Sequence, residues 1–358
     1  MRPIRPLKLL VVCPNWVGDA VMATPTLRLL RRELRGSFIG ALTRPGIDRV
    51  LDGAGFFDEV HVEPRSGMMG PKKAAAKVRP RHYEAALLLT NSFSTALTAR
   101  LAGIPRRHGY DRDGRGLLLT DSIRPARTKS GDWAIVPAVD YYLALARAML
   151  GASSEQTGEA SRAAGLEPAP DPVLELGVRD EDDAAAAAVL EDLGVSGAFA
   201  MLVPGGSKEK KRWPADRFAA IARHLREDRG MAVAVSGSPD EAALVRAVAE
   251  GGGATALLDA RVHLGVLKGI VRRAGLMVTN DTGPRHLAVA LGVPVVALFG
   301  PTDHRWTIVP GRAPEVVVLA DPTLEPTESA NDHPERCAID RISVERVREA
   351  VARALGER

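Results

Sequence analysis

Short apolar runs alternate with segments of helical periodicity along most of the chain. The first run, Leu7 to Cys13, predicts a buried strand, and apolar side chains spaced by three and four residues predict a helix over 19–35. The same alternation predicts strands at 37–43, 59–62 and 84–90 and a helix at 93–101. Strands that alternate with helices are typical of a parallel sheet covered on both faces, so we expect an α/β fold.

The alternation stops between residues 151 and 176, where Gly, Ser, Ala and Pro predominate, and this segment is predicted to be a linker. Beyond it, helices are predicted at 180–193, 214–226, 239–249, 264–273, 283–291 and 343–355, and strands at 199–203, 231–236, 275–279 and 293–299. A chain of 358 residues exceeds the ~250–300 residues at which a single core stops growing. We therefore expect two doubly wound domains that face a central cleft, where a ligand binds.

Composition and charge narrow the functional classes. The net charge is only +4 and aromatic residues make up 4% of the chain, so we expect no nucleic-acid partner. The two cysteines, Cys13 and Cys337, form no CxxC pair, which indicates neither a disulfide framework nor a structural zinc site and fits a reducing cytoplasm. The apolar run at 9–13 is too short for a signal peptide, and the stretch 287–299 is too short for a membrane span.

The first candidate loop, PNWVGDAVMATP at 14–25, follows the first predicted strand. Its single carboxylate, Asp19, is either a helix-stabilising acid of the next helix or a general base at the carboxyl end of the sheet. The loop lacks GxGxxG, which disfavours a dinucleotide site, and we expect no cofactor.

A second loop, PGGSKEKKRWPADRF at 204–218, suits an anionic ligand. Gly205 and Gly206 permit close approach of the backbone, Ser207 offers a hydroxyl, and Lys211 is one of several cations ahead of a helix. The alternative is a solvated basic loop.

The third loop, VTNDTGPRHLAVALGVPVVALFGP at 278–301, begins another helix. Asn280 or Asp281 is predicted to cap it, and Thr282 and Gly283 would present hydrogen-bond donors at its N-terminus, where phosphates bind. Since a carboxylate repels phosphate, Asp281 is expected to hold the turn or contact sugar hydroxyls. His286 is either structural or part of this cluster.

Two smaller features leave alternatives open. Glu241, in SGSPDE at 236–241, either accepts hydrogen bonds from ribose hydroxyls or is a plain first-turn acid. The loops contain no HExxH, DxD or CxxC spacing, and His333 and Cys337 lack further ligands, so we expect no metal site and a metal-independent reaction.

In this order the loops resemble the ADP-heptose:lipopolysaccharide heptosyltransferases, family 9 glycosyltransferases, with the heptosyltransferase II branch nearest. The resemblance rests on PNWVGD (14–19), LLTNSFSTALTARLAGIPRRHGY (88–110), KRWP (211–214), NDTGPRH (280–286) and VPVVALFGPT (293–302). It implies a GT-B fold with a Rossmann-like acceptor-binding domain over 1–165, a Rossmann-like donor-binding domain over 166–342, and a C-terminal helix over 343–358 that packs back across the cleft. It also implies inverting transfer of heptose from ADP-L-glycero-β-D-manno-heptose to the first heptose of the lipopolysaccharide inner core.

The resemblance assigns roles by position. Asp19 would be the general base, Lys211 would neutralise the donor phosphates, and Thr282 with Gly283 would bind the diphosphate. The other donor-binding residues would be Gly205, Gly206, Ser207, Glu241 at the ribose, Val262 at the adenine, Asp281 and His286, and the acceptor-binding residues would be Asn15, Trp16, Asn91 and Ser92.

The implied acceptor is a lipid-linked Kdo/heptose glycan that carries phosphates and carboxylates. Basic residues that could meet it, or could simply form a solvated surface, are Arg65, Lys72, Lys73, Lys77, Arg79, Arg81, Arg106, Arg107, Arg112 and Arg115. We expect a monomeric cytoplasmic protein in peripheral contact with the inner face of the cytoplasmic membrane, through charge and acceptor rather than insertion. The alternatives are a related transferase with another nucleotide sugar or acceptor, and a catalytically inactive nucleotide-sugar-binding protein.

Overall fold

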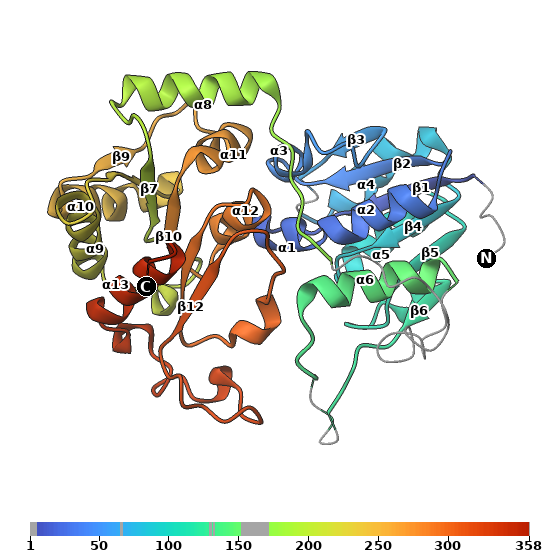
Figure 1. Ribbon diagram of the computed structural model, residues 1–358. Helices are drawn as coiled ribbons and strands as arrows, with labels where there is room; N and C mark the ends of the chain where they lie inside the picture. Colours follow the sequence, from blue (N-terminus) through green and yellow to red (C-terminus); the bar gives the residue numbers. More distant parts are fainter. Residues whose placement is uncertain (1–5, 65–66, 129–130, 132, 152–171, 358) are drawn as a thin grey trace. The chain divides into compact units, whose positions relative to one another are not determined.

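The computed structural model describes residues 6–64, 67–128, 131, 133–151 and 172–357. The chain divides into two compact units, which we call unit 1 (residues up to 177, with 305–309) and unit 2 (residues 178–304 and 310–358). Each unit is an α/β structure (Figure 1). The predicted boundary at residue 165 and most of the predicted linker lie outside the described residues.

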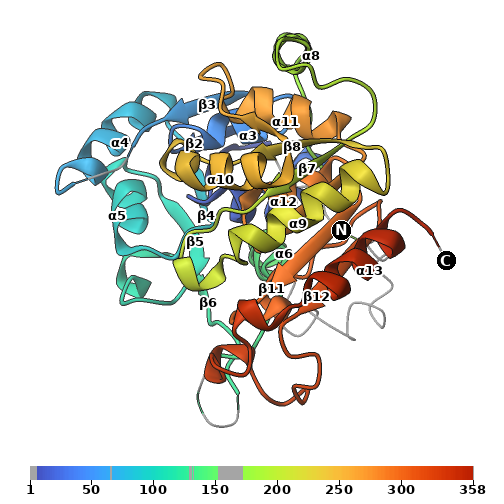
Figure 2. The same ribbon diagram turned by 90° about the vertical axis from the view of Figure 1, so that its left-hand side faces the viewer.

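Unit 1 contains a parallel sheet in the order β3-β2-β1-β4-β5-β6. Its strands are β1 (Lys8–Val12), β2 (Phe38–Thr43), β3 (Glu59–Val62), β4 (Ala85–Leu88), β5 (Arg106–Tyr110) and β6 (Asp121–Ile123). Its helices are α1 (Val17–Met22), α2 (Thr24–Glu33), α3 (Ile47–Leu51), α4 (Gly70–Val78), α5 (Phe93–Leu101) and α6 (Ala138–Met149). Figure 2 shows α4 beside α5, and the buried faces of both helices join the core that covers β1 and β4.

The helix predicted over 19–35 is two helices, because the chain breaks between α1 and α2 at Ala23. Pro25 lies in the first turn of α2, where its missing N–H costs nothing. The Thr24 hydroxyl donates a hydrogen bond to the Val21 carbonyl, 2.7 Å away, and closes the break. Side-chain periodicity alone did not reveal this break, since the apolar face continues through it.

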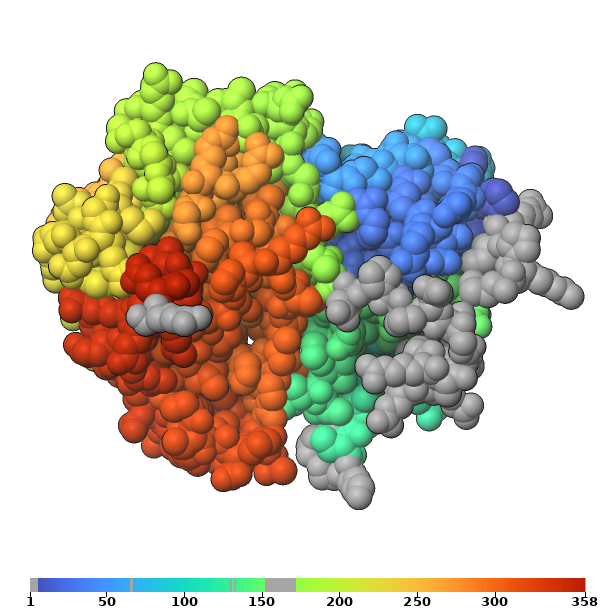
Figure 3. Space-filling model, in the orientation of Figure 1, coloured from blue at the N-terminus to red at the C-terminus, as the bar shows by residue number. Residues whose placement is uncertain are grey.

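Unit 2 contains a second parallel sheet, in the order β12-β11-β10-β7-β8-β9. Its strands are β7 (Phe199–Val203), β8 (Ala232–Ser236), β9 (Thr255–Leu257), β10 (Leu276–Asn280), β11 (Val295–Phe299) and β12 (Glu315–Leu319). Its helices are α8 (Asp180–Asp192), α9 (Ala215–Glu227), α10 (Ala242–Gly252), α11 (Leu264–Arg273), α12 (Gly283–Ala290) and α13 (Val344–Ala354). Figure 3 shows α8, in light green, at the surface of this unit.

Both sheets follow the same winding. In unit 1 the first strand, β1, pairs with β2 on one side and β4 on the other, and in unit 2 β7 pairs with β8 and β10. Each sheet is therefore doubly wound, and the predicted fold of two such domains is confirmed. Ligands of doubly wound sheets bind at the carboxyl ends of the strands where the winding reverses. We call these places the first switch point (β1 and β4) and the second switch point (β7 and β10).

The C-terminal helix α13 packs within unit 2. Val347, Ala350, Val351 and Ala354 are buried in the core that also contains residues of α9, β11 and β12. Ser343 caps the helix as predicted, since its hydroxyl accepts a hydrogen bond from the backbone N–H of Arg346 at 3.3 Å. Across the described part of the chain, no helix has both the length and the apolar character needed to span a bilayer.

Residues 172–177, which include the end of the predicted linker, are packed on unit 1. The backbone N–H of Glu175 donates to the Thr24 hydroxyl at 3.1 Å, and its carboxylate forms an ion pair with Arg28. Gly177 lies so close to Gly53 that a Cβ atom on Gly177 would stand 2.0 Å from the Gly53 carbonyl oxygen. This stretch is therefore a fixed part of unit 1.

Candidate functional site

The first switch point gathers the residues predicted to serve the acceptor. The loop after β1 carries Asn15 and Trp16 into α1, and Asp19 lies in the first turn of that helix. The loop after β4 carries Asn91 and Ser92 into α5. Because Val12 and Leu88 are paired at the ends of β1 and β4, the two loops leave the sheet side by side. Trp16 is 71% exposed.

Asp19 is held by a tyrosine of α6. Its Oδ1 atom accepts a hydrogen bond from the Tyr142 hydroxyl at 3.1 Å. Burial, with the adjacent Asp19 carboxylate, raises the pKa of Tyr142 well above its usual value, so this hydroxyl stays protonated and donates. Asp19 does lie in the first turn of α1, as the helix-acid alternative predicts. In addition, Tyr142 contacts its carboxylate. The sequence pattern missed Tyr142 because it did not predict α6.

Asn91 is held by the buried Arg115 and the half-buried Tyr141. Its Oδ1 accepts from Nη2 of Arg115 at 3.3 Å and from the Tyr141 hydroxyl at 3.1 Å. Arg115 was among the basic residues that could meet the acceptor, but it is fully buried, which lowers the pKa of its guanidinium to about 10. Its remaining donors bind the carbonyl oxygens of Thr90 and Tyr110. Arg115 therefore shapes the loop after β4 from within.

Asn280 ties the two strands of the second switch point together. Its amide nitrogen donates to the carbonyls of Pro204 at 2.8 Å and Gly205 at 3.0 Å, and its Oδ1 accepts from the backbone N–H of Trp213 at 3.2 Å. The prediction that Asn280 or Asp281 caps the next helix is wrong, since Thr282 occupies the cap position of α12. Asn280 is wholly buried and instead fixes the glycine loop after β7.

An ion-pair chain crosses the second switch point. Lys211 Nζ lies 3.2 Å from Asp281 Oδ2, and Arg285 Nη1 lies 3.4 Å from Asp281 Oδ1. Arg285, 1% exposed, also binds Glu315 at 2.6 Å. Asp281 thus links the loop after β7 to α12. The Lys211 side chain is 17% exposed and therefore not fully enclosed by its protein partners.

The N-terminus of α12 lies at the same edge of the sheet. Its first turn contains no acidic residue, and Pro284 lies within it. Thr282, at the cap position, makes no capping hydrogen bond through its side chain; its hydroxyl lies 3.2 Å from that of Thr279. The Gly283 amide therefore belongs to a helix end whose partial positive charge suits an anion.

Glu241 is brought to the glycine loop by hydrogen bonds. Its two carboxylate oxygens accept from the backbone N–H groups of Gly206, at 2.8 Å, and Ser238, at 2.9 Å. A Cβ atom on Gly205 would stand 2.3 Å from this carboxylate, so a larger residue there would displace the Glu241 side chain. Each oxygen keeps a further lone pair that a ribose hydroxyl can use. Ser207 is exposed at the tip of the loop.

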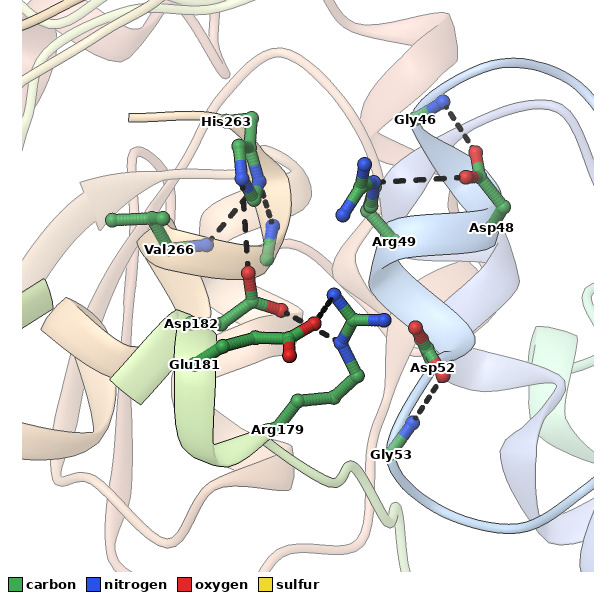
Figure 4. A network of polar contacts seen from close by, with 11 residues as sticks. Gly46, Asp48, Arg49, Asp52, Gly53, Arg179, Glu181, Asp182, His263 and Val266 are labelled. Carbon is green, nitrogen blue, oxygen red and sulfur yellow. Dashed lines mark hydrogen bonds and ion pairs between the residues drawn. The ribbon is translucent and has the colours of Figure 1, made fainter. Parts of the chain in front are cut away.

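Val262 lies farther from the second switch point, since it follows β9, which β8 separates from β7. The next residue, His263, caps α11: its Nδ1 accepts from the backbone N–H of Gly265 at 3.1 Å and of Val266 at 3.5 Å (Figure 4). Its Nε2 is 3.7 Å from the buried Asp182. These contacts fix the turn that carries Val262.

His286 is buried in the first turns of α12. Burial and the adjacent Arg285 lower the pKa of His286 to about 3, so its ring is neutral at physiological pH. In the described part of the chain no group hydrogen-bonds its Nδ1. The structural alternative for His286 agrees with this placement.

Possible metal ligands do not converge. Among the described residues, no group of three or more His, Cys, Asp or Glu side chains is placed to hold a metal ion. His333 instead pairs with Glu328 at 3.1 Å, and Cys337 is a buried free thiol.

Known proteins resemble this chain in sequence and in fold. The sequence profile of glycosyltransferase family 9 (heptosyltransferase) matches residues 72–333. The chain is 28% identical over 328 residues to lipopolysaccharide heptosyltransferase 2 of Escherichia coli, an alignment that covers 84% of this chain and 85% of that protein. It is 26% identical over 341 residues to lipooligosaccharide heptosyltransferase 2 of Haemophilus ducreyi, with coverage of 88% and 89%.

Solved structures agree. The E. coli ADP-heptose lps heptosyltransferase II matches with a TM-score of 0.78 and 25% identity, over 98% of each chain. A family 9 glycosyltransferase from Veillonella parvula matches with a TM-score of 0.81 and 22% identity, over 98% of this chain and 97% of that one, and supports the fold alone. The expected GT-B fold is thereby confirmed. Because the family profile spans well over half of the sequence, the chain belongs to glycosyltransferase family 9, the heptosyltransferases.

Proposed function

We propose that this protein transfers heptose from ADP-L-glycero-β-D-manno-heptose to the first heptose of the lipopolysaccharide inner core, with inversion. Family membership and the heptosyltransferase 2 relatives support the sugar and the acceptor. The observation that carries the proposal is the second switch point, where Lys211, still partly exposed, stands beside the N-terminus of α12. A cation and a helix N-terminus at one strand edge suit a sugar diphosphate.

Bond cleavage in this reaction places negative charge on the departing ADP. Lys211 would exchange part of its contact with Asp281 for a diphosphate oxygen, while Thr282 and Gly283 would bind the same group. Arg285 would still balance the negative charge of Asp281 during that exchange. The remaining donor contacts would come from residues assigned by the resemblance, namely Gly205, Gly206, Ser207, Glu241, Val262 and Asp281. The buried His286 would support the loop that carries Asp281.

Asp19 would take the proton from the attacking acceptor hydroxyl. A single in-line attack inverts the anomeric carbon, and a positioned base raises its rate by roughly 10²–10⁴-fold. Asn15, Trp16, Asn91 and Ser92 would hold the acceptor around this carboxylate. We accordingly propose that the acceptor domain begins with residues 1–165 and the donor domain lies within 166–342, with residues 172–177 packed on the acceptor side.

Mass measurement tests the reaction directly. The protein is incubated with ADP-heptose and heptosyl-Kdo2-lipid A, and the glycolipid is expected to gain the mass of one heptose. Asp19→Asn serves as the matched control, because it keeps the size of the side chain and removes the base. No gain in mass overturns the proposed acceptor or donor, and parallel incubations with other nucleotide sugars show whether a related transfer takes place. Release of ADP from none of them indicates a binding protein without catalysis.

We also propose that unit 1 makes peripheral contact with the cytoplasmic face of the inner membrane. Its α4 and α5 contain no acidic residue, and Lys72 and Lys73 lie exposed in the first turn of α4. Exposed apolar side chains also belong to this unit, with Met68 97% and Leu117 78% exposed. Residues 1–177 carry 25 Lys and Arg against 18 Asp and Glu, whereas residues 178–358 carry 23 against 26. Basic residues near an anionic bilayer each contribute about 1 kcal/mol of attraction.

Co-sedimentation with vesicles tests this contact. The protein is expected to bind vesicles that contain phosphatidylglycerol more tightly than pure phosphatidylcholine vesicles, and the double variant Lys72→Glu, Lys73→Glu should bind at least about tenfold less tightly. Arg348→Glu with Arg353→Glu makes the same charge change on the exposed side of α13. An equal loss in this control, or equal binding to both kinds of vesicle, overturns the assignment of the surface to unit 1.

A further inference from the structure

Two adjacent tyrosines of α6 each contact one loop of the first switch point. The Tyr142 hydroxyl lies 3.1 Å from Asp19 Oδ1, and the Tyr141 hydroxyl lies 3.1 Å from Asn91 Oδ1. We propose that Tyr141 and Tyr142 are positioning residues, of which Tyr142 orients the base Asp19 and Tyr141 orients the Asn91 amide toward the acceptor sugar. This inference rests on the proposed function.

The orientation of the Asn91 amide follows from its partners. A guanidinium can only donate hydrogen bonds, so the Asn91 atom that faces Arg115 must be the oxygen. The Tyr141 hydroxyl donates to the same oxygen. The amide nitrogen then points away from both, and no group of the described chain accepts a hydrogen bond from it. Asn91 thus offers two N–H donors to a hydroxyl or carboxylate oxygen of the acceptor.

The partners of Asn91 are themselves fixed. The Tyr141 ring stacks on Tyr110, with ring centres 3.8 Å apart and planes 14° apart, and the Tyr110 hydroxyl donates to the Tyr141 carbonyl at 2.7 Å. The Tyr110 carbonyl in turn accepts from Arg115 Nε at 2.9 Å. A Cβ atom on Gly109 would stand only 3.1 Å from Arg115 Nη2, so the glycine leaves room for the guanidinium. This packing holds the Asn91 oxygen in one direction.

Tyr142 orients the Asp19 carboxylate, as Tyr141 orients the Asn91 amide. Its hydroxyl has one proton, which it donates to the carboxylate, and its ring is buried in unit 1. A hydrogen bond donated to a carboxylate favours the charged form, which is the form that acts as a base. Loss of the hydroxyl should therefore lower the fraction of ionised Asp19, while acceptor binding changes little.

Three Tyr-to-Phe variants separate these roles in the full-length protein. Tyr142→Phe should lower kcat about tenfold and move the acidic limb of its pH profile to higher pH, with the acceptor KM nearly unchanged. Tyr141→Phe should raise the acceptor KM about threefold to tenfold, with kcat nearly unchanged.

The matched control is Tyr83→Phe. Tyr83 is a buried tyrosine of the same unit whose hydroxyl lies 2.8 Å from His61, and it precedes β4 whereas Asn91 follows that strand. Removal of this hydroxyl should alter neither parameter. The same split of kcat and KM in all three variants would indicate a purely structural role for the α6 tyrosines and overturn the proposal.

A titration that needs no substrate completes the test. The ¹³C carboxyl resonance of Asp19, assigned through Asp19→Asn, is followed with pH in the wild-type protein and the three variants. The pKa of Asp19 should rise in Tyr142→Phe alone; an unchanged titration overturns the role of Tyr142. Because this measurement does not depend on the sugar transferred, a negative heptose assay overturns the proposed function alone, and the titration decides by itself whether Tyr142 acts on Asp19.

Discussion

The two switch points have the same strand order and different chemistry. At the first, a carboxylate and an amide are held by the neutral hydroxyls of Tyr142 and Tyr141. At the second, Lys211 is held by Asp281, which the buried Arg285 also binds. Topology therefore determines where side chains meet, whereas the residue types determine whether the site suits a hydroxyl nucleophile or a diphosphate.

Among variants that test this comparison of the two switch points, Asp19→Ala should have the largest effect. Loss of the base should lower the rate of transfer by about 10²–10⁴-fold, while the affinity for the donor, measured by calorimetry with ADP, stays unchanged. The reason is that Asp19 belongs to unit 1 and the residues proposed to bind the diphosphate belong to unit 2. Unchanged turnover in this variant would remove Asp19 from the mechanism.

Lys211→Met is the corresponding change at the second switch point. A hydrogen bond to a charged group contributes about 1.5–3 kcal/mol, so the donor KM should rise about 10- to 150-fold and the acceptor KM should not change. Lys208→Met, in the same loop and exposed, is the matched control and should have a small effect. If the control matches Lys211→Met, the loop acts through its overall charge instead of through one ammonium group.

The sequence predicted much of the fold because its central strands are apolar throughout. Predicted bounds match β3, β7, α5 and α11. The pattern missed α4, α6, β5, β6, β9 and β12. The β5 sequence, RRHGY, is too polar to signal a strand, and β6 and β9 have three residues each. Strands of this kind form because a neighbouring strand supplies hydrogen bonds, which no local pattern records.

The sequence predicted part of the candidate site, as it did for the fold. The loops that follow β1, β7 and β10 could be placed from strand and helix order alone, and they carry Asp19, Lys211 and Thr282. The side chains that hold them could not, because Tyr142 lies 123 residues from Asp19 and Asp281 lies 70 residues from Lys211. Long-range partners of this kind depend on tertiary packing. Asn280 was assigned to the wrong role for the same reason, since its partners follow a different strand.

A stability comparison of two asparagines tests how each switch point is built. Asn280→Ala would leave the Trp213 N–H and the carbonyls of Pro204 and Gly205 without their buried partner, so the free energy of unfolding should fall by about 2–4 kcal/mol. Asn91→Ala, at a half-buried position, should cost about 1 kcal/mol. Urea titrations of both variants measure the difference. Equal losses would indicate that the first switch point depends on Asn91 for its fold as much as for its chemistry.

The smallest expected effect concerns the pH dependence of stability. His286 in unit 2 has its pKa lowered to about 3 by burial and by Arg285, against the opposing influence of Asp281, whereas an unfolded histidine titrates near 6.5. Between these values the unfolded state binds a proton that the folded state does not, so the free energy of unfolding must fall as the pH drops from 6.5 toward 3. Each such group contributes a slope of at most about 1.4 kcal/mol per pH unit. His286→Gln should make the measured slope shallower by a detectable part of this amount.

In unit 1, burial also lowers the pKa of His61, but Glu59 opposes the shift, so His61→Gln should flatten the slope less. A larger change from His61→Gln would mean that the loss of stability at low pH arises mainly in unit 1.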